Sequence, residues 1–229
     1  MAPKILVIIP ALNEEGSIGK VIADIPEGLV SEVVVVNNAS TDGTAKEAES
    51  GGATVIEELR RGYGQACLTG IEYAESLQNR PDIIVFLDGD YSDYPGEMSR
   101  IVKPITDGDY DMVIGSRKLG NAEPGAMMPQ ARFGNALATT LIKWLYGVKF
   151  TDLGPFRAIK FAKLRELGMA DTTYGWTVEM QVKAAKMGYR GTEVPVSYRK
   201  RIGVSKISGT ISGSVKAGYK ILWTIFKYM

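Results

Sequence analysis

The sequence predicts a single-domain α/β fold, a doubly wound and mostly parallel sheet with helices on both faces. Short β-branched runs alternate with segments whose apolar residues recur at helical spacing. These runs are continuously apolar rather than alternating, which indicates strands that are buried on both faces, as in a parallel sheet. The chain has 229 residues, of which 45% are hydrophobic and 23% are charged, so it can bury a substantial core.

Five strands and four helices are expected in the first half of the chain. The apolar runs place strands at residues 5–9, 33–36, 54–56, 83–87 and 112–114. Helices are expected after Ser17, after residues 41–44 as far as Ala48, and over residues 64–77 and 97–105. Ser17 and residues 41–44 offer side chains that can cap the first two of these helices.

The second half of the chain is less regular. The pattern predicts helices over residues 132–145 and 178–187, strands at 156–159 and 193–198, and a final helix over 209–229. The sequence contains no internal repeat, low-complexity segment or evident linker. We therefore expect residues 1–208 to form one domain, to which the helix over 209–229 also belongs.

The composition excludes several kinds of chemistry. The chain has no histidine, and so lacks the commonest general base and the commonest ligand of transition metals. Any acid–base or metal chemistry would rest on Asp and Glu, whose oxygens favour hard cations such as Mg²⁺. The single cysteine, Cys67, cannot form an intrachain disulfide, which excludes a disulfide scaffold.

Nothing in the sequence predicts export or a membrane span. The apolar run at residues 5–9 is shorter than the hydrophobic region of a signal peptide, and no small-residue cleavage site follows it. No stretch reaches the roughly 18 apolar residues of a transmembrane helix. We expect a cytoplasmic protein, either soluble or attached peripherally to the inner face of the membrane.

The charges are unevenly distributed along the chain. Residues 1–180 carry 17 basic and 25 acidic side chains, whereas residues 181–229 carry 10 basic and 1 acidic side chain. A basic tail is typical of a segment that meets an anionic partner, although a solvated lysine face gives the same pattern. We expect that partner to be a membrane surface rather than nucleic acid. The sequence predicts no particular oligomeric state.

The predicted helix over 209–229 is amphipathic. Three lysines share one side of it at the helical period: Lys216, Lys220 and Lys227. Apolar residues occupy the other side: Ile211, Val215, Leu222, Ile225 and Phe226. This pattern is typical of a helix lying on anionic lipid headgroups, and equally of an amphipathic helix packed on its own domain.

The segment Asp88-Gly89-Asp90 follows a buried strand and is the main candidate site. Carboxylates two residues apart point to opposite faces of a strand, but a glycine between them lets the backbone turn so that both can approach one site. Asp93 lies close by in the sequence. The expected ligand is Mg²⁺ or Mn²⁺ bridging a diphosphate, with few protein ligands and several waters.

Two further polar clusters follow the first two predicted strands, at residues 10–16 and 37–44. The carboxyl ends of neighbouring parallel strands meet at one edge of a sheet, so these clusters are expected to lie next to each other. Their amides and carboxylates can contact the edge of a nucleobase and a ribose. Helix capping is the alternative role for Ser40, Thr41 or Asp42.

Taken together, these motifs resemble family 2 glycosyltransferases. Residues 8–15 resemble the opening motif of the family, residues 36–44 its base-binding loop, and residues 87–90 its Asp-x-Asp motif. Later motifs resemble the dolichyl-phosphate or polyprenyl-phosphate mannose synthase branch: residues 113–117, Asp152 with Phe156-Arg157, and residues 203–206. The resemblance spans nearly the whole chain in the right order.

This resemblance implies a GT-A fold, a nucleotide-sugar donor such as UDP-glucose or GDP-mannose, and Mg²⁺ or Mn²⁺. In this branch a hexose passes to the phosphate of a polyprenyl or dolichyl lipid with inversion at the anomeric carbon. The implied donor-binding residues are Pro10, Leu12, Glu14, Asn37, Asn38, Asp88, Gly89 and Asp90. Asp88 and Asp90 would bind the metal and, with Arg117, be catalytic. The implied acceptor-phosphate residues are Arg117, Arg132, Arg201 and Lys206.

The chain departs from the family pattern at two places. Asn37-Asn38 stands where the family usually carries Asp-Asp, and an amide both donates and accepts hydrogen bonds. Asn38 is therefore expected to accept from uracil N3–H and donate to O4, which favours a UDP-sugar over GDP-mannose. Residues 91–95 also lack the glutamine that some members place beside the metal. Ser92 or Asp93 is expected to substitute for it.

A phosphate acceptor suits a chain without histidine. A hydroxyl acceptor needs a general base, whereas a phosphate monoester, with a second pKa of about 6, is mostly dianionic at neutral pH. If the acceptor is instead a sugar hydroxyl, Glu179 is the candidate base, although it also fits a charged residue in the first turn of a helix.

Two other classes of protein share parts of this pattern. A sugar-1-phosphate nucleotidyltransferase is expected to carry a Gly-rich, basic phosphate loop after the first strand, and residues 10–15 are acidic instead. A non-catalytic binding module would not need the Asp88-Gly89-Asp90 segment or the arginines.

Overall fold

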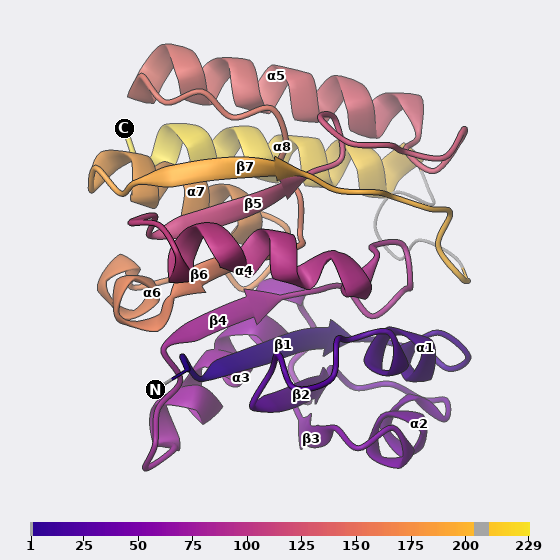
Figure 1. Ribbon diagram of the computed structural model, residues 1–229. Helices are drawn as coiled ribbons and strands as arrows, with labels where there is room; N and C mark the ends of the chain where they lie inside the picture. Colours follow the sequence, from indigo (N-terminus) through magenta and orange to yellow (C-terminus); the bar gives the residue numbers. More distant parts are fainter. Residues whose placement is uncertain (1, 204–210) are drawn as a thin grey trace.

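The structure is a computed structural model that describes residues 2–203 and 211–229, with the side chains of residues 211–215 excepted. Its centre is a seven-stranded sheet in the order β3-β2-β1-β4-β6-β5-β7 (Figure 1). The strands are β1 (Ile5–Ala11), β2 (Glu32–Asn37), β3 (Thr54–Glu57), β4 (Ile83–Phe86), β5 (Met112–Ser116), β6 (Arg157–Lys160) and β7 (Gly191–Pro195). Only β6 runs antiparallel to its neighbours, β4 and β5, so the predicted mostly parallel sheet is confirmed.

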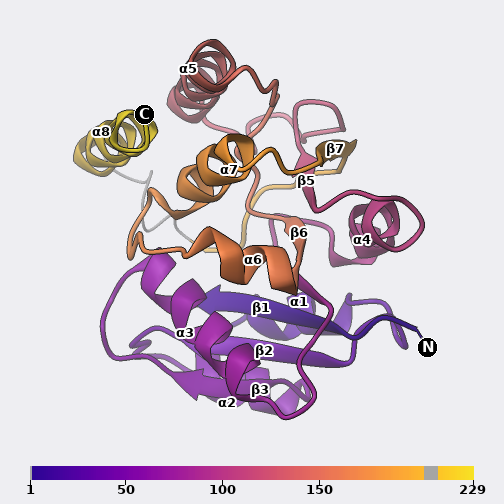
Figure 2. The same cartoon turned by 90° about the vertical axis from the view of Figure 1, so that its left-hand side faces the viewer.

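Helices cover both faces of this sheet. They are α1 (Ile18–Ala23), α2 (Thr44–Ser50), α3 (Tyr63–Ser76), α4 (Met98–Thr106), α5 (Pro129–Tyr146), α6 (Phe161–Leu167), α7 (Trp176–Lys186) and α8 (Ile211–Lys227), with a 3₁₀ turn, Pro95–Glu97, before α4. α1, α2 and α4 pack on one face, and α3, α5, α6, α7 and α8 contribute to the core on the other. α5 and α8 form the outermost part of that second face (Figure 2).

Each face of the sheet has its own hydrophobic core. Alternate side chains of β1 enter the two cores, Leu6 and Ile8 on the α3 side and Val7 and Ile9 on the α1 side. All four are almost fully buried, and each such side chain contributes about 1.5–3 kcal/mol of stability. The continuously apolar run in the sequence is therefore the consequence of burial on both faces.

Most of the predicted helices and strands are present, but two details differ. The helix α6 was not predicted, since its apolar residues Phe161, Leu164 and Leu167 extend over only two turns. Ser17 precedes α1, but its hydroxyl donates to the Glu14 carbonyl at 2.8 Å instead of capping the helix, so the predicted cap is wrong. Asp42 does accept from the backbone N–H of Thr44, the first residue of α2, at 3.0 Å.

The predicted C-terminal helix is present as α8, which packs against α5 and α7. Its Ile225 is fully buried in the core, whereas Phe226 is exposed. The side chains of Ile211 and Val215 lie outside the described residues. In the part of the chain that the structure describes, we find no helix with the length and apolar character of a membrane span.

Candidate active site

The polar motifs of the sequence meet at one edge of the sheet, beyond the carboxyl ends of β1, β2, β4 and β5 (Figure 1). Ala11 and Asn37 are paired in the register of β1 and β2, so residues 10–16 and 37–44 begin side by side. Asp88 follows β4, the other neighbour of β1. The chain therefore places its acidic pair beside both polar clusters, as parallel strand topology requires.

Asp88 and Asp90 are held by different partners. Asp88 accepts a hydrogen bond from the Tyr63 hydroxyl at 3.0 Å, which leaves its second oxygen without a partner among the described residues. Asp90 is buried and accepts from the backbone N–H of Ser92 at 2.9 Å and from its hydroxyl. Its other oxygen forms an ion pair with Arg201 at 2.8 Å.

The two carboxylates share an environment that disfavours two uncompensated negative charges. Burial, followed by the charge of Asp90, raises the pKa of Asp88 to about 7. Arg201, Tyr63 and Arg117 act in the opposite direction. A bound cation would favour the ionised form of Asp88, because an opposite charge stabilises a carboxylate.

The donor set fits a hard divalent cation such as Mg²⁺ or Mn²⁺. Two carboxylates converge here, and the described residues contain no cluster of three or more His, Cys, Asp or Glu side chains suited to a metal. Mg²⁺ keeps several waters and commonly takes only one or two carboxylates together with substrate phosphates. Asp88 and Asp90 would therefore hold the cation jointly with the diphosphate of a donor.

Arg117 follows β5 and is locked in place by Asp152. Its Nε and one terminal nitrogen donate to the two carboxylate oxygens at 2.8 and 2.6 Å, and its backbone N–H donates at 2.8 Å. Its guanidinium also lies 5.0 Å from the centre of the Tyr198 ring. Burial lowers the pKa of Arg117, but the charge and hydrogen bonds of Asp152 outweigh burial and raise it. Arg117 is thus a permanent, oriented positive charge.

Asp93 is enclosed beneath the acidic pair. It is 2% exposed, and neither carboxylate oxygen has a hydrogen-bond partner in the described structure. Burial, followed by the charge of Asp88, raises its pKa well above the usual range. Ser92, the other residue expected to replace the family's glutamine, is instead engaged with Asp90.

Asn38 does not have the free amide that the sequence suggested. Its Nδ2 donates to the carbonyls of Glu58 at 3.0 Å and Arg60 at 2.8 Å, and its Oδ1 accepts from the backbone N–H of Gly62 at 2.7 Å. Because both N–H groups are used, the expected donation from Asn38 to uracil O4 is wrong for this conformation. Asn38 holds the loop between β3 and α3.

Asn37 does have a free acceptor. Its Nδ2 donates to both carboxylate oxygens of Glu57 at 2.9 Å, which fixes the direction of the amide. Its Oδ1 is buried and has no hydrogen-bond partner among the described residues. A buried carbonyl oxygen without a partner is costly, so this atom is suited to a donor supplied by a ligand.

The loops after β1 and β2 are tied together. Thr41 donates its backbone N–H to Asn13 Oδ1 at 2.8 Å, and Asn13 donates its own to Ser40 Oγ at 2.9 Å. The backbone N–H of Glu14 donates to the Thr44 hydroxyl at 2.8 Å. Ser40 and Thr41 thus join the two loops and do not cap α2, so the helix capping expected of them is wrong. Pro10 and Leu12 lie at the carboxyl end of β1, and Gly89 follows Asp88 beyond the carboxyl end of β4.

Gly62, directly before α3, and Gly64, in the first turn of α3, permit a close approach to the segment at residues 171–172. A Cβ at Gly62 would lie 2.2 Å from the carbonyl oxygen of Thr172, and one at Gly64 would lie 2.0 Å from that of Asp171. Neither position can carry a side chain without moving the backbone. This packing places Tyr63, which lies between the two glycines, against Asp88. Sequence analysis assigned no role to Tyr63 or to Glu57.

Glu179 is not placed to act as a base. It is fully buried and accepts from the backbone N–H groups of Ala170 and Asp171 and from the Tyr228 hydroxyl, and it pairs with Lys183 at 2.7 Å. Burial alone would raise its pKa, but these donors lower it. Its carboxylate therefore joins α7, the loop before it and the end of α8. Glu179 lies in the first turn of α7, as the alternative interpretation predicted.

The structure describes two of the three other predicted cations, Arg132 and Arg201. Arg201 reaches Asp90, Arg132 is exposed in the first turn of α5, and Lys206 lies outside the described residues.

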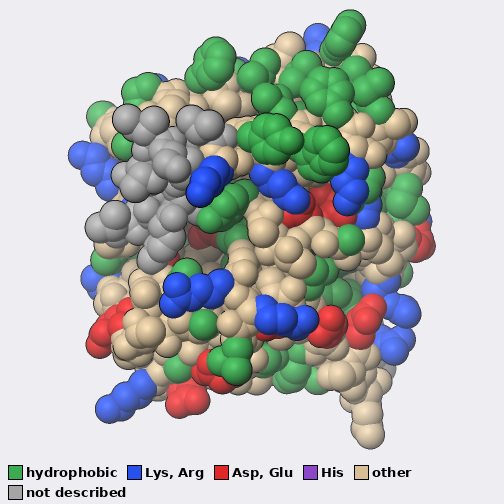
Figure 3. Space-filling view, turned by 180° about the vertical axis from the view of Figure 1, so that it is seen from behind, with side chains coloured by type: hydrophobic (Ala, Val, Ile, Leu, Met, Phe, Trp, Pro, Cys, Tyr) green, Lys and Arg blue, Asp and Glu red, His purple; other side chains and the backbone are tan. Residues whose placement is uncertain are grey.

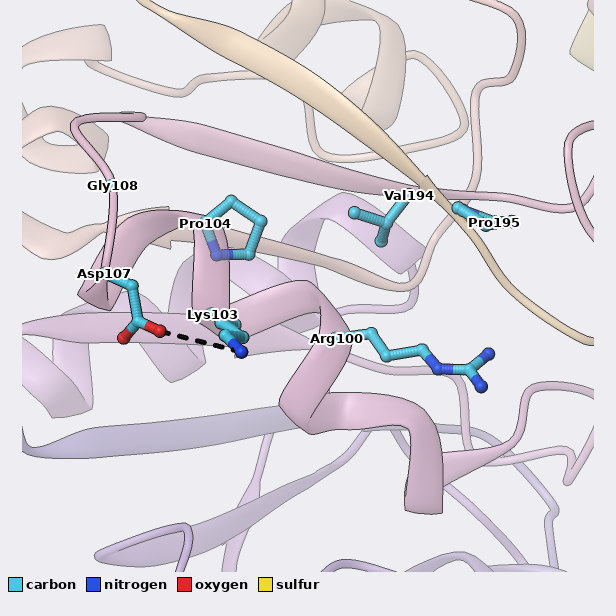
Figure 4. A pocket seen from close by; sticks show the side chains of 7 residues that line it. All are labelled: Arg100, Lys103, Pro104, Asp107, Gly108, Val194 and Pro195. Atoms are coloured by element: carbon cyan, nitrogen blue, oxygen red, sulfur yellow. Dashed lines mark ion pairs between the residues drawn. The ribbon is translucent and has the colours of Figure 1, made fainter.

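An open depression on the flank of the sheet, between α4 and β7, does not carry comparable chemistry (Figure 4). Pro104 and Val194 form an apolar wall there, and the ion pair between Lys103 and Asp107 spans 3.9 Å. It has no pair of converging carboxylates. The candidate active site is therefore the carboxyl edge of the sheet.

The chain as a whole is similar to known proteins. Residues 6–168 match the family described as glycosyl transferase family 2. The chain is 35% identical over 215 residues to an uncharacterized glycosyltransferase of Mycobacterium tuberculosis, covering 93% of this chain and 94% of that protein. It is 31% identical to an undecaprenyl-phosphate mannosyltransferase of Micrococcus luteus, with 92% and 90% covered, and 35% identical to a dolichyl-phosphate hexose transferase of Haloferax volcanii, with 91% and 88% covered.

The fold is also similar to a solved structure. Glucosyl-3-phosphoglycerate synthase of M. tuberculosis superimposes with a TM-score of 0.75 at 22% identity, covering 99% of this chain and 80% of that one. The same synthase has been solved with Mn²⁺, UDP and glucosyl-3-phosphoglycerate, with a TM-score of 0.74. At this identity the similarity concerns the fold alone.

Proposed function

Because the chain belongs to glycosyl transferase family 2, we propose that it moves a hexose from a nucleotide sugar to a polyprenyl phosphate. It is a glycosyltransferase, and the proposal concerns its donor, its acceptor and its metal. The observation that carries the proposal is the arrangement of Asp88 and Asp90 with two arginines, Arg117 and Arg201, around the same edge of the sheet. The acids suit a cation and a diphosphate, and the arginines suit an incoming anion.

The described site contains cations but offers no evident general base. Histidine is absent from the sequence, and the carboxylate of Glu179 is fully occupied by its own hydrogen bonds. A phosphate monoester is largely ionised near neutral pH, so it needs only to be held close to the donor sugar. An oxygen of that phosphate would attack the anomeric carbon while the bond from this carbon to the nucleoside diphosphate breaks, with inversion.

The chain's own residues would stabilise the charges that move in this step. A bound Mg²⁺ or Mn²⁺ supplies a Lewis acid for the departing diphosphate. Arg117, oriented by Asp152, and Arg201, beside Asp90, would offset the repulsion between two anions brought together. Tyr63 would keep Asp88 oriented through its hydroxyl.

The donor nucleotide that we propose is UDP. The free Oδ1 of Asn37 offers one buried acceptor, which matches the single ring N–H of uracil, whereas guanine presents an N–H and an adjacent amino group. Glu57 keeps this oxygen directed away from itself by binding the Nδ2 group. The relatives named for undecaprenyl-phosphate and dolichyl-phosphate transfer support the lipid acceptor.

A sugar hydroxyl is the second candidate acceptor. The match to glycosyl transferase family 2 identifies the reaction class without identifying the acceptor, so this alternative is tested as well. The pH profile separates the two acceptors, because a hydroxyl acceptor requires a base whose protonation would reduce the rate.

The proposal is tested by incubating the protein with Mg²⁺ or Mn²⁺, UDP-glucose or GDP-mannose, and undecaprenyl phosphate. We expect a hexosyl phosphoryl lipid, detected by mass spectrometry, with the UDP-sugar as the better donor. Replacing the acceptor by undecaprenol, which has no phosphate, is the matched control and should give no product. Equal transfer to undecaprenol, or transfer only to soluble sugars, would contradict a phosphate acceptor.

A further inference from the structure

Exposed hydrophobic side chains gather on one part of the molecule, the outer surface of α5 and α8. These large side chains lie on the two helices or directly at their ends: Met128, Phe133, Leu137, Trp144, Tyr219, Trp223, Phe226 and Met229. Over the rest of the described chain, only four others are exposed: Leu59, Leu119, Tyr174 and Met187. Scattered exposed hydrophobic residues are normal, whereas a contiguous group marks an interaction site.

On α5 the exposed residues form a stripe directed away from the core. Phe133 is 72% exposed and Trp144 79%, and with Leu137 they fall within about 40° of the helix circumference. Ala138 and Ile142 are fully buried on the opposite side. The helix is thus apolar on both sides, although only one side is needed for packing.

α8 repeats this arrangement. Tyr219, Trp223 and Phe226 fall within about 60° of one another, while Thr224 and Ile225 are buried on the opposite side. The predicted apolar side of this helix is therefore divided, because Ile225 packs in the core whereas Phe226 belongs to an aromatic stripe that faces outward.

The two helices that carry the stripes are neighbours. Tyr146, the last residue of α5, donates its hydroxyl to the backbone carbonyl of Ile225 near the end of α8, so the helices end side by side (Figures 1 and 2). The space-filling view from behind shows hydrophobic side chains gathered over this end of the molecule, with a band of Lys and Arg side chains beneath them (Figure 3).

The charged side chains of these two helices are all basic. Neither α5 nor α8 contains Asp or Glu, and together they carry five basic residues. Lys220 is paired with Asp171 at 2.9 Å. The other four are exposed: Arg132, Lys143, Lys216 and Lys227.

We infer that the outer surface of α5 and α8 binds the surface of an anionic lipid bilayer. Tryptophan and tyrosine favour the boundary between headgroups and acyl chains, and flanking lysines are attracted by anionic headgroups. A second copy would have to bring the same acid-free surface against this one, which like charges oppose. The inference rests on these helices alone and not on the acceptor of the reaction.

This surface is linked to the candidate active site through α5. Asn135 donates to the carbonyl of Thr151 at 3.0 Å and accepts from the backbone N–H of Leu153 at 2.8 Å. It thereby holds both sides of Asp152, which orients Arg117. A helix that rests on a bilayer thus holds the segment that carries the oriented arginine.

Tryptophan fluorescence tests whether both helices contact lipid. Of the three tryptophans, Trp176 is fully buried and only Trp144 and Trp223 are exposed. Trp223→Phe therefore leaves Trp144 as the only exposed reporter, and Trp144→Phe leaves Trp223. With phosphatidylglycerol vesicles and neither donor nor acceptor, we expect a blue shift and quenching by brominated lipid in both variants. A Trp144 signal that is unchanged by lipid would overturn the role of α5.

Vesicle sedimentation measures the affinity. Replacing both exposed tryptophans by serine should lower partitioning by at least about 100-fold, because two large apolar side chains no longer enter the interface. Lys143→Glu and Lys227→Glu should each lower it about fivefold or more. Two matched controls on other surfaces, Leu59→Ser (79% exposed) and Lys103→Glu, should leave partitioning onto the vesicles unchanged. Thermal melts check that every variant is folded.

Three outcomes would overturn the inference. The first is that the wild-type protein does not sediment with anionic vesicles. The second is equal binding to phosphatidylcholine and phosphatidylglycerol vesicles. The third is self-association without lipid that shields Trp144 and Trp223 from acrylamide, which would make a second copy the partner. None of them depends on transfer activity.

Discussion

Asp152→Asn isolates the contribution of the carboxylate that orients Arg117. Asp152 is fully buried and accepts three hydrogen bonds from Arg117, one from its backbone and two from its guanidinium. Asparagine preserves the shape but removes the charge, so the guanidinium of Arg117, 14% exposed, stays largely enclosed without a counterion. Removing one partner of a buried ion pair costs about 3–5 kcal/mol, and the partial exposure of Arg117 places the expectation near 3 kcal/mol.

The assay is urea unfolding at pH 7 of the wild type, Asp152→Asn, Arg117→Gln and the double variant. We expect Asp152→Asn to lower the free energy of unfolding by about 3 kcal/mol and Tm by about 6–12 °C. The double variant should lose less than the sum of the single variants, because no unpaired charge remains. Additive losses, or an Asp152→Asn variant within about 0.5 kcal/mol of the wild type, would refute the reasoning.

Four further changes test other parts of the site. Asp90→Ala should abolish transfer while leaving a folded protein, and wild-type turnover with Mg²⁺ in that variant would remove Asp90 from the metal site. Asn37→Asp should shift the ratio of UDP to GDP affinity by about tenfold toward GDP, because a second acceptor replaces the amide. Thermal shifts with each nucleotide measure this ratio. An unchanged ratio would exclude contact between residue 37 and the base. The hydrogen bond from Arg60 is the main cause that lowers the pKa of Glu58 in the folded protein. The ionised carboxylate therefore stabilises the fold above its unfolded pKa of about 4.3, and this stabilisation is lost as the pH falls below that value. The difference in Tm between the wild type and Glu58→Gln should accordingly narrow from pH 7 to pH 3, whereas a constant difference would contradict the ionised pair. Glu179→Gln should lower Tm but leave the pH dependence of turnover unchanged, and loss of one limb of that profile would restore Glu179 as a base.

The fold could be predicted because its strands are buried on both faces. A parallel sheet covered by helices makes runs such as residues 5–9 and 83–87 continuously apolar, and this signal is local in the sequence. The edge that carries Asp88 and Asp90 followed from the same rule. The antiparallel insertion of β6 between β4 and β5 had no local signal, since pairing depends on residues that are distant along the chain.

The roles of individual polar side chains were harder to predict. Asn37 and Asn38 are adjacent and chemically identical, yet one is directed by the Glu57 side chain and the other is used by the backbone of the next loop. Glu179 looked free in the sequence because Tyr228, its partner, lies 49 positions further on. A residue type and its spacing define what a side chain can do, whereas the partners that tertiary packing supplies decide whether it remains available.

We propose that Asp88 and Asp90 hold a divalent cation against the diphosphate of the donor. Crystals grown with UDP and Mn²⁺, measured at the manganese absorption edge, test it directly. We expect one anomalous peak within coordination distance of both carboxylates and of the diphosphate oxygens. Bound UDP with no peak there, or with manganese held only by other side chains, would contradict the account.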